Sequence, residues 1–129
     1  MRHLAILCTL FMSILMVSPF HAHAASRKAN SVPLIVITYN QPRIHYNKQL
    51  YQAMSRAVAI KPELMVTVAS FIPKTSNSRY NEQMRHSSMR QRQQLIHDLR
   101  AIGIPKDRIH VTTEYVTDSK HHELYVYVD

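Results

Sequence analysis

The stretch SSMRQRQQLIHDLRAIGIPKDRI, residues 87–109, predicts a basic amphipathic helix that ends at the only glycine of the chain and leads into a strand. Leu95, Leu99 and Ile102 recur at helical spacing, and Ser88 and Arg92 continue their row toward the N-terminus. The other faces of this helix carry Arg90, Gln93, His97 and Arg100. Gly103 can take the left-handed conformation of a helix C-cap, and the following Ile104-Pro105 does not easily continue a helix.

The part of the chain before this helix predicts two strands and a first helix. Residues 34–39 (LIVITY) and 64–71 (LMVTVASF) are apolar, β-branched runs, which are typical of strands buried on both faces. Between them, Asn47 is a candidate cap for a helix that Lys61-Pro62 ends. The apolar stripe of this helix consists of Leu50, Met54, Ala57 and Val58. Residues 72–82 are polar and predict a long connecting loop.

Two further strands are predicted after Gly103. Residues 108–115 alternate as a third strand, and residues 117–121 form a turn. In the last strand Leu124, Val126 and Val128 alternate with Glu123, Tyr125 and Tyr127. The order β-α-β-α-β-β predicts an α+β fold, a two-layer sandwich with helices on one face of a mixed sheet. The last two strands are close enough in the chain to form a hairpin.

Residues 1–24 have the layout of a secretory signal peptide. Arg2 precedes an apolar run over residues 4–17, and the A-x-A pattern at residues 22–24 is a cleavage signal. The run is shorter than the about 20 residues that a membrane span needs. We therefore expect cleavage, with an uncleaved anchor as the alternative, and a flexible leader over residues 25–32. The only cysteine, Cys8, lies inside the run, which excludes a disulfide framework and a cysteine nucleophile and disfavours a lipoprotein.

The chain is basic, with a formal net charge of +8 at pH 7, and export would remove only Arg2 from its charged residues. This balance favours anionic partners such as phosphate-rich lipids, acidic polymers or an acidic protein face. Arginines that could follow a nucleic-acid backbone are Arg79, Arg85, Arg90, Arg92 and Arg100. Export argues against nucleic acid as the partner.

Several strings are similar to the OmpA-like C-terminal domain, a periplasmic module that anchors envelope proteins to peptidoglycan. Residues 99–109 (LRAIGIPKDRI) resemble its L-x-x-x-G-I-P-x-D-R-I passage from helix to strand. Tyr39-Asn40 resembles its aromatic-Asn exit from the first strand. Tyr80-Asn81 with residues 88–92 resembles its N-x-x-L-S-x-x-R-A helix, and residues 124–128 resemble its closing strand. The resemblance covers about residues 33–129, which we take as one domain.

This resemblance implies a ligand site, because in that family an aspartate after the second strand and an arginine on the next helix hold the diaminopimelate of the peptide stem. Here those positions fall on about Pro73 and on Gln91, and no acidic residue lies within residues 64–79. The candidate ligand residues are Ser88, Arg90, Gln91 and Arg92. We expect weak or no stem binding, because the ammonium of the ligand would meet a basic surface containing Lys74, Arg79 and Arg85.

Other kinds of site find less support. Beyond the signal segment the histidines are His45, His86, His97, His110, His121 and His122. His86 and His97 are too far apart along a helix to share a metal, and the His121-His122 pair is typical of a solvated loop, so we expect no metal site and no cofactor. Neither a nucleophile elbow nor a phosphate-binding glycine loop is present, which disfavours an enzyme.

Tyrosines on the last strand indicate a protein interface. Tyr125 and Tyr127 are predicted on the open face of the sheet, joined by Tyr115 or by an outward residue of the second strand, and tyrosine is enriched in interfaces. We therefore expect a non-enzymatic periplasmic scaffold or assembly subunit of an envelope complex, such as an outer-membrane or secretion-type assembly. The alternative is a peptidoglycan anchor that uses a displaced basic pocket. A third hypothesis, with less support from the sequence, is a periplasmic enzyme or a metal carrier.

Overall fold

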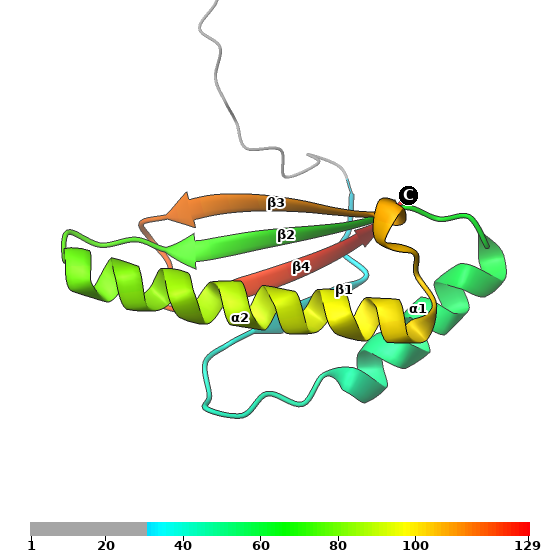
Figure 1. Cartoon of the computed structure of the whole chain (residues 1–129), viewed down its shortest axis with the longest axis horizontal. Coiled ribbons are helices and arrows are strands. Elements are labelled where there is room, and N and C mark those ends of the chain that lie inside the picture. The colour runs from blue at the N-terminus through cyan, green and yellow to red at the C-terminus, as the bar shows by residue number, and fades with distance from the viewer. Residues whose placement is uncertain (1–30) are drawn as a thin grey trace, which may run out of the picture.

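The computed structural model describes residues 31–129, which form a four-stranded mixed sheet with two helices (Figure 1). The elements are β1 (Ile35–Thr38), α1 (Asn47–Ile60), β2 (Val66–Pro73), α2 (Ser78–Ile102), a short 3₁₀ turn (Lys106–Arg108), β3 (Ile109–Val116) and β4 (Glu123–Val128). The α+β class and the β-α-β-α-β-β order are confirmed. The predicted signal peptide, Cys8 and all but the last two residues of the predicted leader lie outside the described residues.

The sheet has the order β1-β4-β2-β3, in which β4 lies between the first two strands. β4 runs antiparallel to both β1 and β2, and β2 runs parallel to β3. The parallel pair expected of a β-α-β unit is therefore present across α2. The predicted hairpin of the last two strands is wrong, because β2 separates β3 from β4 and β4 pairs with strands far away in the sequence.

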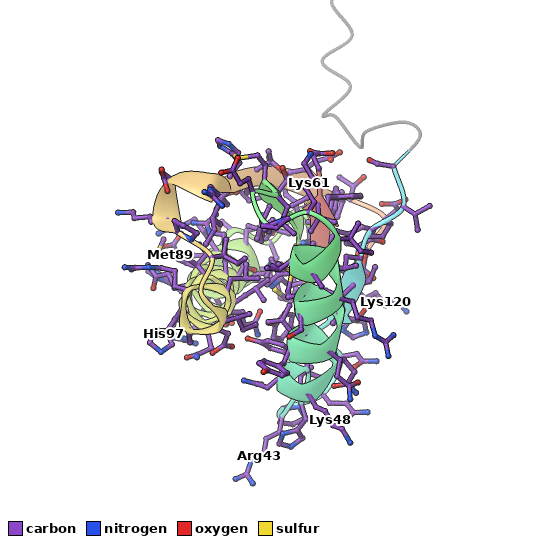
Figure 2. The ribbon with its side chains drawn as sticks, turned by 90° about the vertical axis from the view of Figure 1, so that its right-hand side faces the viewer. Arg43, Lys48, Lys61, Met89, His97 and Lys120 are labelled. Carbon is purple, nitrogen blue, oxygen red and sulfur yellow. The ribbon has the colours of Figure 1, made fainter. Side chains whose placement is uncertain are left out.

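The core lies between the sheet and the two helices, which occupy the same face of the sheet (Figure 2). The predicted stripes are confirmed: Leu50 and Met54 of α1 and Leu95 and Leu99 of α2 are fully buried. Opposite them lie Val66 and Val68 of β2 and Leu124 and Val126 of β4. The sheet-facing side of α2 also carries polar contacts, because Gln91 of α2 contacts His122, which in turn contacts Ser70 of β2.

The first strand differs from its prediction. β1 is shorter than residues 34–39 and forms an edge of the sheet, with Ile37 buried but Val36 44% exposed. An apolar run does not reveal whether a strand is central or lateral, and here the central position belongs to β4. The second strand is buried as predicted, although it spans Val66–Pro73 rather than residues 64–71.

The helix that contains residues 87–102 begins at Ser78, so the predicted loop over residues 72–82 is wrong. Its first half has a sparse apolar stripe of Tyr80 and Met84, and the side chain of Asn77 accepts a hydrogen bond of 3.0 Å from the Tyr80 N–H and caps the helix. Asn81 closes the remaining loop: its side chain accepts from the Thr75 N–H at 2.9 Å and donates to the Thr75 carbonyl at 2.8 Å. Helix α1, by contrast, has Tyr46 and not Asn47 at its N-cap.

Gly103 ends α2 as predicted. Its φ of 110° is left-handed, its N–H donates to the Arg100 carbonyl at 3.0 Å, and the Ile104 N–H donates to the Leu99 carbonyl at 3.2 Å. This pair of bonds is a Schellman motif, which satisfies carbonyls that a helix end would leave free. Ile104 is then buried against the core, so the turn directs the chain back to the sheet.

Candidate functional site

The four candidate ligand residues do not form one pocket. Ser88, Gln91 and Arg92 lie on the side of α2 toward the sheet, whereas Arg90 is exposed. Ser88 is 1% exposed, and its hydroxyl has no hydrogen-bond partner within the described residues. Gln91 contacts His122, which directly precedes β4, and Arg92 contacts Thr113 of β3, so the helix positions them apart rather than around a common ligand.

Gln91 belongs to a chain of hydrogen bonds that links α2 to β2 through His122, the residue directly before β4. Its Oε1 lies 2.7 Å from Nδ1 of His122, and Nε2 of His122 lies 2.7 Å from Oγ of Ser70. Because a carbonyl oxygen only accepts, His122 donates from Nδ1 to Gln91 and accepts from the Ser70 hydroxyl. The neutral ring therefore satisfies both neighbours with one tautomer.

His122 corrects the expectation of a solvated loop pair. It is 2% exposed, its ring stacks on Tyr39 with centroids 5.3 Å apart, and only His121 lies at the surface. Burial, together with the nearby positive charge of Arg92, lowers the pKa of His122 from 6.5 to about 4. The sequence held a signal for this position, since His122 continues the inward alternation of Leu124, Val126 and Val128 by one step.

This chain of contacts has the order of a nucleophile, a base and an orienting group, but it is closed to solvent. Ser70 is 1% exposed and His122 is 2% exposed, so neither side chain faces a cleft that a substrate enters. A general base must reach the proton that it abstracts from the substrate. The arrangement accordingly serves as an internal hydrogen-bond network that connects α2, β2 and the residue directly before β4.

A second hydrogen-bond network joins the two helices. The Tyr46 hydroxyl donates to Oδ2 of Asp98 at 2.6 Å, and the side chain of Gln94 donates to Oδ1 of the same carboxylate at 3.0 Å. The Tyr39 hydroxyl is buried nearby, within the electrostatic reach of Tyr46 and Asp98. Burial, reinforced by the Asp98 charge, raises the pKa of Tyr39 to about 12, so this phenol stays neutral at physiological pH.

A shallow groove of about 300 Å³ lies between α2 and β3. Its lining consists of Ile72, Arg85, Met89, Arg92, Thr113 and Tyr115. Nη1 of Arg92 donates to Oγ1 of Thr113 at 2.8 Å, and Arg85 is paired with Glu82, with Nη2 and Oε1 2.7 Å apart. Figure 2 looks along α2 and shows Met89 on the groove side of the helix and His97 pointing away from the sheet. The remaining donors of Arg92 give this groove the chemistry to hold a carboxylate or another small anion.

The three tyrosines proposed as an interface do not share a face. Tyr125 lies opposite Ala69 on the open side of β2, but Tyr115 lies opposite Ile72, whose side chain faces the helices. Tyr127 is only 7% exposed and packs with Ala69 and Phe71, and the rings of Phe71 and Tyr125 meet edge to face at 4.9 Å. Tyr115 alone of the three is largely exposed, at 52%.

Comparison with models of known families finds no match for this chain, and comparison with curated proteins finds none either. Within residues 31–129 no group of three or more histidine, cysteine, aspartate or glutamate residues is placed to hold a metal ion. Neither helix of this part of the chain combines the length and the apolar character that a membrane crossing needs.

Proposed function

We propose that this protein is a non-enzymatic scaffold or assembly subunit of a cell-envelope complex, exported to the periplasm and built on an OmpA-like domain that has lost its ligand site. The observation that supports the loss is the position of Gln91. This residue matches the arginine of the family, and here it is turned inward and hydrogen-bonded to His122. The position matching the aspartate, Pro73, ends a buried strand.

The surface of the domain fits contact with an acidic protein face. Within residues 31–129, α2 carries exposed arginines at positions 79, 90 and 100, while Glu82 of the same helix is already paired with Arg85. Charge complementarity of this kind steers association and sets the register of an interface. The partner we propose is therefore an acidic surface of an outer-membrane or secretion-type assembly.

The test places a photo-reactive amino acid at Arg90 or at Tyr51 and irradiates cells that express the protein. Both positions are exposed, but Arg90 lies on the basic helix and Tyr51 on α1. We expect an adduct with a defined envelope protein at position 90 and none at position 51. Absence of the protein from the periplasmic and envelope fractions, or equal labelling from both positions, would refute the proposal.

A peptidoglycan anchor is the second candidate, and the groove beside Arg92 favours it. A guanidinium there can bind a carboxylate of the peptide stem, but no acidic residue lines the groove to hold the ammonium. Binding of the purified protein to peptidoglycan sacculi distinguishes the two functions. Saturable binding that resists salt, and that Arg92→Ala abolishes while Arg90→Ala does not, would establish the anchor in place of the scaffold.

A further inference from the structure

The outer edge of β3 carries unpaired backbone groups. β3 is the last strand of the sheet, and no other strand within residues 31–129 lies beyond it (Figure 1). The Lys74 N–H donates to the Val116 carbonyl at 2.8 Å, which fixes the side on which the backbone of β3 meets β2. Because backbone groups alternate along a strand, those of Val111, Thr113 and Tyr115 point away from the sheet. Arg92 bonds only the side chain of Thr113 and leaves these groups available.

The outer edge of β3 has little protection against pairing, and Glu114 is the one Asp, Glu, Lys or Arg along this strand. Natural edge strands are kept apart by lysine, proline, bulges or shortness. β3 is eight residues long with the sequence IHVTTEYV, which contains neither lysine nor proline, whereas β1 at the opposite edge has four residues. Val111 is 40% exposed and Tyr115 is 52% exposed, so apolar surface accompanies the free backbone groups.

We infer that two copies of this chain pair along β3, antiparallel and about a two-fold axis at Thr112, to form one continuous sheet. Residues opposite each other across an antiparallel pair lie on the same face of the sheet. In this register His110 of each copy lies opposite Glu114 of the other on the open face. Val111 lies opposite Thr113, and Ile109 opposite Tyr115, on the face that carries the helices.

A second copy fits this edge because the strand is complementary to itself. The symmetry repeats the His110–Glu114 contact twice, places an imidazole that can donate a hydrogen bond beside a carboxylate, and sets no like charges directly across from each other. Centring the axis on Thr113 instead would place His110 opposite Val116 and Glu114 opposite Thr112, which separates the imidazole from the carboxylate. In the favoured register each Val111–Thr113 pair exchanges two backbone hydrogen bonds.

Sedimentation of the purified protein tests the pairing. The measurement uses about 0.15 M salt, which screens the Arg92 side chains that pairing brings onto one face. We expect a concentration-dependent dimer that Val111→Lys converts to a monomer, because lysine on a natural edge strand prevents pairing with another chain. Val36→Lys, at a comparably exposed valine of β1, is the matched control and keeps the dimer. A protein that stays monomeric at all concentrations, or a dimer unaffected by Val111→Lys, would overturn the inference.

Cysteine cross-linking tests the register. In a Cys8→Ser background, Thr112→Cys places two thiols across the axis at a non-hydrogen-bonded pair, where the Cα atoms are about 4.5 Å apart and a disulfide can form. His110→Cys lies on the same face but is four residues from its copy, about 13 Å along the strand. We expect a disulfide-linked dimer from the first variant only. Equal cross-linking of the two variants would refute the axis at Thr112.

Discussion

Acidification should destabilise this protein through His122, and the size of the effect follows from its burial. The folded protein takes up a proton on His122 only near pH 4, whereas 6.5 is the ordinary pKa that applies in the unfolded chain. Between these values the unfolded state binds more protons, so the free energy of unfolding falls as the pH falls. The contribution of His122 is complete above about pH 6.5 and levels off below about pH 4.

The shift sets the magnitude of this loss. At about 1.4 kcal/mol per pKa unit, the change in His122 alone lowers the free energy of unfolding by about 2 kcal/mol between pH 7 and pH 5, and by about 3 kcal/mol by pH 4. A proton on Nε2 would also remove the acceptor that the Ser70 hydroxyl uses. Protonation of His122 therefore disrupts the hydrogen-bond network that connects α2 to β2.

Urea denaturation at a series of pH values, with His122→Gln as the comparison, measures this contribution. Glutamine can donate to Gln91 and accept from Ser70 but does not titrate in this range. The difference in pH dependence between the two proteins isolates His122 from the carboxylates. His121→Gln, at the exposed neighbour, is the control and should keep the wild-type slope. Identical slopes for the wild type and His122→Gln between pH 7 and pH 5 would refute the reasoning.

Four substitutions test other parts of the structure. Gly103→Ala should cost about 1–2 kcal/mol in urea denaturation from backbone strain at φ 110° alone, since no atom lies within 4 Å of the added Cβ; unchanged stability would contradict this. Asn77→Ala should cost about 1 kcal/mol through the lost cap, with a loss of helical circular dichroism. Tyr46→Phe should cost about 1–3 kcal/mol because Asp98 loses a donor, and a neutral result would show that Gln94 suffices. Arg92→Gln should raise the pKa of His122, followed by NMR titration, because it removes a nearby positive charge.

Local sequence patterns predicted the elements better than their arrangement. The stripes of Leu50 and Met54 and of Leu95 and Leu99, and the helix stop at Gly103, follow from spacing and from backbone conformation, which are properties of short segments. The position of β4 between β1 and β2 depends on contacts between segments far apart in the chain. An apolar run such as residues 34–39 contains no information about which neighbours it will have.

The candidate site shows the same limit. The first turns of α2 carry only Tyr80 and Met84 as apolar residues, so the cap at Asn77 is the clearest mark of where the helix begins. Gln91 was identified as a departure from a family pattern, but its partner His122 lies 31 residues away and was assigned to a solvated turn. Extending the alternation of Leu124 and Val126 back by one step would have placed His122 inside. No pattern within α2 could have paired it with Gln91.

The central position of β4 bears on when the domain can fold. β1 joins the sheet only through β4, with Ile35 opposite Val126, and β4 is also the antiparallel neighbour of β2. A chain that has emerged from a ribosome or a translocation pore only as far as β3 still lacks the strand that connects its first element to the rest. Until residues 123–128 arrive, the inner edge of β2 and all of β1 remain unpaired and open to aggregation. The domain can therefore complete its fold only after its last strand has been delivered. A chain that crosses a membrane before β4 has paired does so without a formed core.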